Sequence, residues 1–497
     1  MFDLKEKAKA GALWASVEVA TTGVVQFVRI AILARFFISA EEFGLFALAS
    51  TAVVAISAFS ALGTIPYILF RTDADRSAIS GVYWLNVASG LVFCALTVLC
   101  ADTLAAALGD ARLVLPLQLL ALVLVIDSIG NPLTAIMVRD FQFRPHAWAE
   151  TSSTLIGTLA ALAIAAHGDG IWALVIGTLL QRLVRAAIAL WWGLRHRPIA
   201  MQATRVELAA FSNFSVYTIA ERLAAAANER APYVFLGWMQ DAAQVGIFAV
   251  TSNLIATPLQ YIMNIALSAF TPVFARMQKE QDKLSSVYFS MLELTMTVIS
   301  PMFLGLMVTA PLVTPMILGP SWAAAVPTVQ WVCISLTVHA IYYFSSALTM
   351  GTGKAKAAFA LMAMQVPGVL AASLLGAKYG GAEAVAMGQA LVSIATIVPY
   401  YLFITRRVLG PCLGRFVAAF AIPIAMGAAM ASTVALFAKV TSISNPYLDL
   451  SSQMAVGAVV YAGMLLAFRP GVVRELLPAA ITDRLARRFA PQERWSH

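Results

Sequence analysis

The chain has 497 residues, of which 60% are hydrophobic and only 12% are charged. This composition lies outside the range of soluble globular domains. The net charge of +8 comes from basic residues spread between apolar segments, a pattern that indicates a membrane protein rather than a nucleic-acid-binding protein. The four cysteines lack the spacing of a metal site, so we expect neither a zinc centre nor a disulfide framework.

Apolar segments long enough to cross a bilayer recur along the chain. About 20 apolar residues span the hydrocarbon core as a helix. Charged and turn residues divide the sequence into such segments, which predicts an all-α integral membrane protein with about 14 transmembrane helices. The predicted spans are residues 11–34, 43–68, 78–100, 113–137, 150–167, 171–194, 211–236, 245–272, 286–310, 326–349, 357–376, 384–404, 416–438 and 451–468.

The distribution of basic residues predicts the orientation of these spans. With a cytoplasmic N-terminus, cytoplasmic segments hold 24 Lys and Arg, the opposite loops hold four and the spans hold five, which accounts for all 33. Cytoplasmic loops of membrane proteins carry such an excess. We therefore expect both termini in the cytoplasm, with residues 1–10 and 469–497 as short cytoplasmic ends.

A short motif near the start of the second span returns near the start of the eighth. Residues 43–47 read Phe-Gly-Leu-Phe-Ala and residues 245–249 read Val-Gly-Ile-Phe-Ala, 202 positions later because 245 minus 43 is 202. A second short motif, Leu108-Gly109, also recurs, as Leu318-Gly319. Such repeats are typical of transporters whose two halves move about a central site.

The repeat predicts two six-helix lobes around a central cavity. The N-lobe covers residues 11–194 and the C-lobe residues 211–404, joined by a cytoplasmic loop at 195–210. Six is an even number, so both lobes enter the membrane in the same direction and are parallel repeats. The two remaining spans, within residues 416–468, have no counterpart in the repeat.

Polar residues share one face on several predicted spans. An ionisable side chain in a bilayer is costly and normally faces protein or water. Glu18, Gln26 and Arg29 share a face of the first span, and a row of polar residues follows the eighth span, so we expect these faces to meet at the central cavity. The candidate substrate-binding residues are Gln26, Arg29, Arg182, Arg185, Arg222, Asn228, Arg230, Asn253, Gln260 and Asn264.

The charged residues within the spans are arginines and acids, without a lysine. Arginine stays charged when buried, and its planar fork suits phosphate and carboxylate groups. The acids either pair with these arginines or bind a transported proton or sodium ion, and the sequence leaves both roles open. The candidates for ion coupling are Glu18, Asp127, Glu221 and Glu229. The histidines are isolated in the sequence, and we expect no metal site and no cofactor.

Three stretches carry a resemblance to a known family: residues 9–14, residues 42–47 and residues 318–322. They resemble the polysaccharide transporter branch of the multidrug/oligosaccharidyl-lipid/polysaccharide superfamily, which includes the Wzx-type flippases of bacterial O-antigen and exopolysaccharide synthesis. The similarity extends over about residues 5 to 410. Its motifs have low specificity, so they indicate the family but do not identify the transported glycan.

This resemblance implies two six-helix bundles around a V-shaped cavity in the bacterial inner membrane. It implies transport of an oligosaccharide repeat unit, linked to undecaprenyl pyrophosphate, from the cytoplasmic to the periplasmic leaflet. The expected partners are this lipid-linked oligosaccharide, the bilayer and other membrane proteins of polysaccharide assembly, with no nucleic acid. The position of Glu18 also resembles that of an acidic cation-coupling residue in the drug-antiporter branch.

Several alternatives remain at the level of sequence. A drug/cation antiporter of the same superfamily needs a largely apolar cavity, which the five intramembrane arginines disfavour. The lipid II flippases have a more cationic cavity than these balanced charges suggest. A membrane enzyme of glycan assembly is disfavoured by the short loops and the absence of catalytic motifs, so we expect no enzyme activity. The repeat does not exclude a non-gated scramblase or scaffold.

Overall fold

The computed structural model describes residues 2–70, 76–196, 205–278, 280–352, 355–441 and 443–469. Within these ranges the chain is almost entirely helical and contains no strand. Eleven helices in this part are long and apolar enough to cross a membrane. The prediction of an all-α membrane protein is confirmed.

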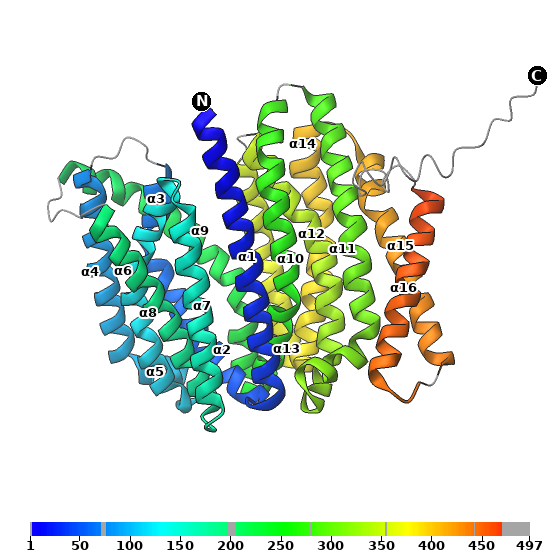
Figure 1. Cartoon of the computed structure of the whole chain (residues 1–497), viewed down its shortest axis with the longest axis horizontal. Helices are drawn as coiled ribbons and strands as arrows, with labels where there is room; N and C mark the ends of the chain where they lie inside the picture. Colours follow the sequence, from blue (N-terminus) through cyan, green and yellow to red (C-terminus); the bar gives the residue numbers. More distant parts are fainter. Residues whose placement is uncertain are drawn as a thin grey trace, which may run out of the picture.

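Most of the N-lobe forms the left-hand part of the molecule in Figure 1, and its first helix, α1, runs down the middle beside α10. Its elements are α1 (Phe2–Phe36), α2 (Ala40–Ser60), α3 (Thr64–Phe70), α4 (Arg76–Leu99), α5 (Ala101–Ala107), the 3-10 turn η1 (Ala111–Leu113), α6 (Val114–Arg139), α7 (Phe143–Ala165) and α8 (Gly170–His196). The second predicted span is broken into α2 and α3, because Leu62 and Gly63 take positive φ values of 48° and 71°. A left-handed backbone cannot continue a right-handed helix.

The C-lobe lies beside it and is followed by two appended helices (Figure 1). Its elements are α9 (Arg205–Met239), α10 (Ala242–Met277), α11 (Gln281–Leu318), the 3-10 turn η2 (Pro320–Ala325), α12 (Val326–Gly351), α13 (Ala355–Tyr400), the π-helical turn η3 (Tyr401–Thr405) and α14 (Arg406–Leu409). The appended helices are α15 (Leu413–Val440) and α16 (Pro446–Phe468). They are anchored to α11, where the Tyr461 hydroxyl donates a 2.8 Å hydrogen bond to the Thr297 carbonyl.

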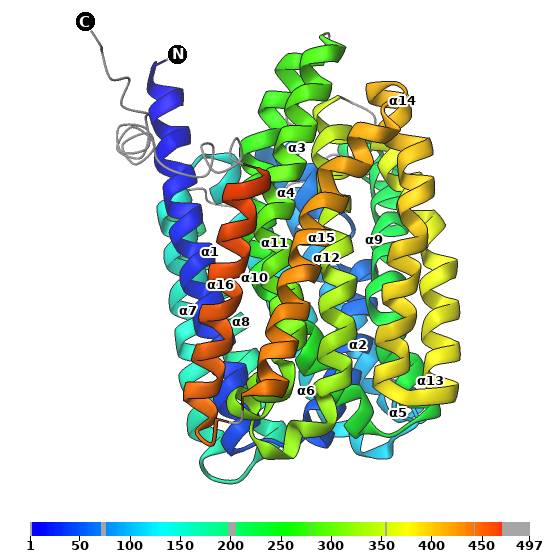
Figure 2. The same ribbon diagram turned by 90° about the vertical axis from the view of Figure 1, so that its right-hand side faces the viewer.

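Helix α13 folds back on itself and corresponds to two predicted spans. Gly381 has φ of 68° at the reversal, and a Cβ added to Gly388 would lie 2.9 Å from the Cβ of Ala372 on the other leg. Figure 2 shows the two legs side by side. Two long helices, α7 and α9, carry several charged residues and are not among the eleven apolar ones. The count of 14 spans therefore stays a prediction.

The two ends of the described chain lie at the same end of the bundle. The start of α1 and the end of α16 are both at the top of Figure 1, and we call this end the upper face. At the opposite end, the lower face, α1 ends at Phe36 and α2 begins at Ala40. The predicted orientation would make the upper face cytoplasmic. The tail beyond Arg469 lies outside the described residues.

The two lobes touch through backbone at the lower face, where the echoed motifs meet each other. A Cβ on Gly44 of α2 would lie 1.6 Å from the carbonyl oxygen of Ala242, and a Cβ on Gly246 of α10 would lie 1.7 Å from that of Ala40. No side chain fits at either position. The repeat of glycine thus has a direct physical cause, which is the close crossing of α2 and α10.

Further contacts surround this crossing and repeat the same symmetry. Gly319 has φ of 102° and packs against the end of α1, while Gly109 has φ of 87° and packs against Gly237 near the end of α9. The Trp322 indole donates a 3.0 Å hydrogen bond to the carbonyl of Ala34. We call this set of contacts the lower seal.

The lower seal has additional hydrogen bonds between the lobes on both sides. The Arg35 guanidinium donates to the carbonyl of Met316, and the Trp238 indole donates to the carbonyl of Ala107. The rings of Phe43 and Trp322 meet edge to face, with centroids 5.8 Å apart. The lobes are therefore closed against each other at the lower face.

Substituting Gly44→Ala is expected to loosen the lower seal. The added methyl group would force two backbones apart, and overpacking of this kind costs about 1–3 kcal/mol. That free energy corresponds to roughly a 5- to 150-fold shift of a two-state equilibrium toward the open seal. The measurement is labelling of Ser50→Cys, behind the seal, by an impermeant maleimide applied from the lower face, in a background without the four native cysteines.

The matched control is Gly463→Ala on α16, where an added Cβ meets nothing within 4 Å. This variant changes helix propensity by the same amount without touching the seal. Labelling that rises in Gly44→Ala and not in Gly463→Ala supports the seal. Equal labelling of both variants from the lower face would contradict it.

Candidate functional site

A large polar cavity lies between the lobes, above the lower seal. It encloses about 1320 Å³ of empty space, including the open space at its mouth, and is lined by α1, α2, α8, α9 and α10. Six of the candidate substrate-binding residues line it: Gln26, Arg29, Arg182, Arg230, Asn253 and Gln260. The faces of the first and eighth predicted spans do meet here, because α1 and α10 both turn their polar residues to the cavity.

Aromatic residues of α2 and α9 contribute to the same cavity. Phe43 and Phe46 come from the first copy of the echoed motif, and Tyr233 comes from α9. Tyr233 was not identified from the sequence. It stands three residues after Arg230 on the same helix, and this spacing places both side chains on one face. That spacing could have identified Tyr233 from the sequence. Thr178 and Gln181 of α8 also line the cavity.

Two of the cavity arginines have no carboxylate partner within the described part of the chain. Arg29 of α1 donates one weak hydrogen bond of 3.5 Å to the Gln181 amide oxygen. Arg230 of α9 stands 5.7 Å from the centre of the Tyr233 ring, and its buried Nε atom has no hydrogen-bond partner. These residues belong to the first helix of each lobe. The cavity therefore holds two cations, one from each side, that are available to an anion.

The arginines of α8 are held by acids of the N-lobe instead. Arg185 lies 2.9 Å from Asp127 and 3.3 Å from Glu150, and it donates a 2.6 Å hydrogen bond to the Asn131 amide oxygen. Arg182 lies 3.4 Å from Asp127. Arg185 is not among the residues that line the cavity, contrary to expectation, because these partners on α6 and α7 draw it into the lobe. Asp127 is an ion-pair partner of both arginines.

Glu18 also has a partner that the sequence did not reveal. Its Oε2 lies 3.1 Å from Nδ1 of His146 on α7, and both side chains are less than a fifth exposed. The two residues are 128 positions apart in the sequence, which hid this contact, so His146 is not isolated in the fold. Among the described residues, no group of three or more His, Cys, Asp or Glu could hold a metal ion.

Among the remaining candidates, those whose side chains the structure describes do not line the central cavity. Arg222 lines a second, smaller pocket with about 490 Å³ of empty space, together with Asp127 and residues of α2, α3, α4 and α6. Asn228 is half-buried, with an amide oxygen that has no partner, and Glu229 is exposed. The side chains of Glu221 and Asn264 lie outside the described part of the structure.

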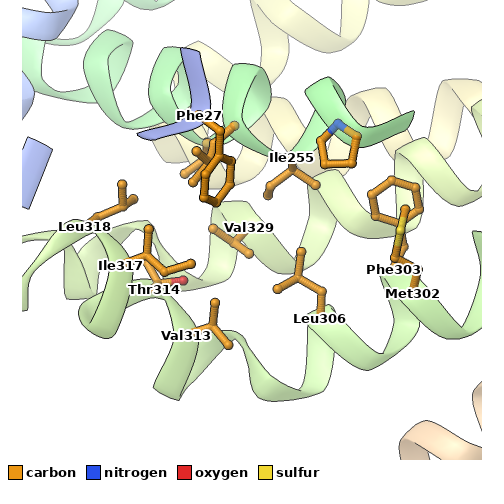
Figure 3. Close-up of a pocket in the computed structure, with 13 residues that line it drawn as sticks. Phe27, Ile255, Met302, Phe303, Leu306, Val313, Thr314, Ile317, Leu318 and Val329 are labelled. Carbon is orange, nitrogen blue, oxygen red and sulfur yellow. The ribbon is translucent and has the colours of Figure 1, made fainter. Parts of the chain in front are cut away.

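An apolar pocket lies on the other side of α1 and α10. It has an empty volume of about 710 Å³ and is lined almost entirely by carbon atoms of α1, α10, α11 and α12. Figure 3 shows Phe27, Ile255, Leu306 and Val329 pointing toward one another around it. Neighbouring residues of α1 thus face different environments, since Gln26 lines the polar cavity and Phe27 the apolar pocket.

The sequence matches a known family over residues 32–327, more than half of the chain, and that family is described as "Polysaccharide biosynthesis protein". The chain belongs to this family. It is 24% identical over 424 residues to lipopolysaccharide biosynthesis protein WzxC of Escherichia coli (strain K12), covering 84% of this chain and 85% of WzxC. It is 24% identical over 469 residues to succinoglycan biosynthesis transport protein ExoT of Rhizobium meliloti (strain 1021), covering 94% of each.

Solved structures with the same fold are transporters. The lipid II flippase MurJ, in an inward closed conformation, superposes with a TM-score of 0.75 at 12% identity, over 93% of this chain and all of that one. An inward-facing multidrug resistance MATE transporter of the MOP superfamily gives a TM-score of 0.63 at 15% identity, over 78% of this chain and 94% of that one. The resemblance to this superfamily is confirmed. The chain is a multi-pass membrane protein of the polysaccharide biosynthesis family and has the fold of known membrane transporters. Among the proteins it is similar to, ExoT is named as a transport protein and MurJ as a flippase.

Proposed function

We propose that this transporter is a flippase for oligosaccharide repeat units linked to undecaprenyl pyrophosphate. It moves them from the cytoplasmic to the periplasmic leaflet of the bacterial inner membrane by alternating access, for the synthesis of an exopolysaccharide, O-antigen or capsule. The observation that carries this proposal is that two guanidiniums, those of Arg29 and Arg230, face one cavity from opposite lobes and have no carboxylate partner among the described residues.

The pyrophosphate group matches these two cations. A guanidinium offers several N–H donors in a planar fork, which suits phosphate oxygens. Charge-assisted hydrogen bonds of this kind are stronger than neutral ones, most of all away from bulk water. Asp127 and Glu150 are already paired with Arg182 and Arg185, so these two acids do not neutralise Arg29 and Arg230.

The rest of the cavity suits a sugar. Gln26, Asn253 and Gln260 provide amide groups, which both donate and accept hydrogen bonds. Tyr233 adds an aromatic surface. A few polar groups among apolar walls are the usual composition of a ligand site. The names of the relatives, which refer to lipopolysaccharide and succinoglycan, agree with a glycan substrate.

The isoprenoid chain has an apolar counterpart beside the cavity. The pocket shown in Figure 3 lies across the α1–α10 pair from the polar cavity, and Phe27 directly follows Gln26. One amphipathic molecule can therefore place its head group on one side of this pair and its tail on the other. Burial of each methylene group contributes about 0.8 kcal/mol.

The lower seal supports a proposed direction of access. The lobes are closed below the cavity by Trp322, Trp238 and the Gly44–Gly246 crossing. If the upper face is cytoplasmic, as the distribution of basic residues predicts, this state receives its substrate from the cytoplasmic side. Opening of the lower seal then exposes the same site to the periplasm.

Removing either unpaired guanidinium is expected to weaken binding of the pyrophosphate group. Arg29→Gln and Arg230→Gln each lose a charge-assisted hydrogen bond, worth about 1.5–3 kcal/mol. The dissociation constant for undecaprenyl pyrophosphate should rise roughly ten- to hundredfold. Native mass spectrometry of the purified protein measures this change.

The matched control is Arg195→Gln at the end of α8, where the guanidinium stacks on Trp191 at 4.3 Å and does not line the cavity. It removes the same charge and is expected to bind undecaprenyl pyrophosphate as the wild type does. Wild-type affinity in both Arg29→Gln and Arg230→Gln would refute the assignment of the head-group site.

Filling the apolar pocket tests the position of the tail. In Leu306→Trp, the larger side chain should displace about two methylene groups, a loss of about 1.6 kcal/mol that raises the dissociation constant on the order of tenfold. Val298→Trp, on the same helix but exposed, is the control. Binding of inorganic pyrophosphate should not change in Leu306→Trp. If the tail lies elsewhere, Leu306→Trp and Val298→Trp should have the same dissociation constant for undecaprenyl pyrophosphate, which would contradict this assignment.

A further inference from the structure

A second polar pocket has walls from both lobes. It holds about 490 Å³ of empty space and is lined by α2, α3, α4 and α6 of the N-lobe together with Arg222 of α9, from the C-lobe. We call it the upper pocket. Besides Arg222 and Asp127, its polar side chains are those of Ser57, Ser60, Thr64, Asn86, Ser128 and Asn131.

Two helices place the upper pocket above the central cavity. On α2, Ser50 lines the cavity and Ser57 lines the upper pocket, about two helical turns apart on the same face. On α9, Arg230 lines the cavity and Arg222 lines the upper pocket, about 12 Å apart along the helix. Since α2 begins at the lower face and α9 ends there, the upper pocket lies on the upper side of the cavity.

One ion pair borders both spaces. Asp127 lines the upper pocket, Arg182 lines the central cavity, and their side chains lie 3.4 Å apart. The cavity and the upper pocket are therefore neighbours. An elongated ligand with one end between Arg29 and Arg230 can place its other end in the upper pocket.

The break between α2 and α3 shapes the upper pocket. Leu62 has φ of 48°, a left-handed conformation that is uncommon for a residue with a side chain, and Gly63 follows with φ of 71°. Strained backbone of this kind is concentrated at functional sites. The break is held by buried hydrogen bonds, since the Thr64 hydroxyl donates to the Asn86 amide oxygen at 3.0 Å and the Asn86 amide nitrogen donates to the Ser128 carbonyl at 2.9 Å. The pocket wall is therefore fixed without a ligand.

The groups that line the upper pocket are complementary to sugar hydroxyls. The hydroxyls of Ser57 and Ser128 each donate a 2.7 Å hydrogen bond to a carbonyl of their own helix, so their oxygen lone pairs are left to accept. Arg222 brings N–H donors. Asp127 is engaged by two arginines of α8. A sugar hydroxyl both donates and accepts, so it can bond to either kind of group.

We propose that the upper pocket is a second glycan subsite, which holds an outer sugar of the repeat unit while the pyrophosphate lies between Arg29 and Arg230. The inference rests on the proposed flippase function and adds a site for the sugar chain. The Arg222 guanidinium donates to oxygens of this sugar, and the Ser57 hydroxyl accepts from one of its hydroxyls. Carrier lipid without a glycan lacks these contacts, so the transporter binds it less tightly than the loaded lipid.

The composition of the subsite also provides for release. In alternating access, one lobe moves against the other around the site. Arg222 belongs to the C-lobe and the rest of the upper pocket to the N-lobe, so this movement changes the distance between Arg222 and the opposite wall. The outer sugar is therefore held in the state that is closed below and released as the lower seal opens.

The first experiment maps the glycan with its native substrate. A small photoreactive diazirine amino acid replaces Ser57, or Ser50 in the cavity, in a host that lacks the chromosomal copy of the gene. After irradiation of the cells, the purified protein is analysed by mass spectrometry. We expect adducts that contain sugars of the repeat unit at both positions. The control is Ser432 on α15, which is exposed and donates to the Ala428 carbonyl of its own helix, and we expect no sugar adduct there.

The outcomes separate the subsite from the function. Sugar adducts at Ser50 and none at Ser57 overturn the second subsite and leave the proposed function intact. Sugar adducts at Ser432 equal to those at Ser57 overturn the subsite as well, because the labelling is then unspecific. Sugar adducts at none of the three positions contradict the proposed function together with the subsite.

The second experiment separates the sugar from the head group by affinity. The two ligands are undecaprenyl pyrophosphate and the lipid-linked repeat unit isolated from a host that lacks the transporter. In Arg222→Gln, we expect the dissociation constant for the lipid-linked repeat unit to rise about ten- to hundredfold, and that for undecaprenyl pyrophosphate to stay unchanged. The unchanged value also shows that the variant is folded. Arg195→Gln is again the control and should alter neither constant. Arg222→Gln that alters neither constant, or both equally, overturns the proposal.

Discussion

The crossing of α2 and α10 at Gly44 and Gly246 is the contact on which the arrangement of this transporter depends. At this point the lobes approach through backbone atoms alone, since no side chain lies between them. Each helix presents its glycine to the carbonyl of the other, so the contact has approximate twofold symmetry. Because the lobes meet so closely here, space is left between them above, and the polar cavity occupies it.

The chemistry of that cavity follows from how charges are distributed between the lobes. In the N-lobe, Asp127 and Glu150 pair with Arg182 and Arg185, and of these four residues Arg182 alone is among those that line the cavity. Of the three arginines that line the cavity, Arg29 and Arg230 are the two without a carboxylate partner among the described residues. An apolar pocket lies on the far side of α1 and α10, so the site has a charged part, the cavity, and an apolar part, this pocket. A substrate with an anionic head group and a long hydrocarbon tail is complementary to both.

Helical periodicity in the sequence predicted several of the residues that line this cavity. It placed Gln26 and Arg29 on one face of α1, and Asn253 and Gln260 on one face of α10, and all four line the cavity. It failed for Arg185, because spacing on α8 does not reveal that acids from α6 and α7 lie within reach. Contacts between distant parts of the chain depend on how helices dock.

The same limit applies to the repeat and to His146. The echo of Gly44 in Gly246 predicted equivalent positions in two lobes, but not that the two residues touch. The Glu18–His146 contact joins α1 to α7 and has no local signal in either helix. The overall fold was more predictable, since long apolar stretches and the excess of basic residues on one side depend on the bilayer and not on tertiary docking.

The central claim is that this protein carries a lipid-linked glycan across the membrane. Deletion of its gene in the host, followed by mass analysis of lipid-linked intermediates and of surface polysaccharide, tests it most directly. The account predicts loss of one surface glycan and accumulation of its undecaprenyl pyrophosphate-linked repeat units on the cytoplasmic side, both reversed by the wild-type gene. Unchanged glycan without trapped intermediates, in a host that has no second flippase for it, would contradict the account and favour a drug/cation antiporter.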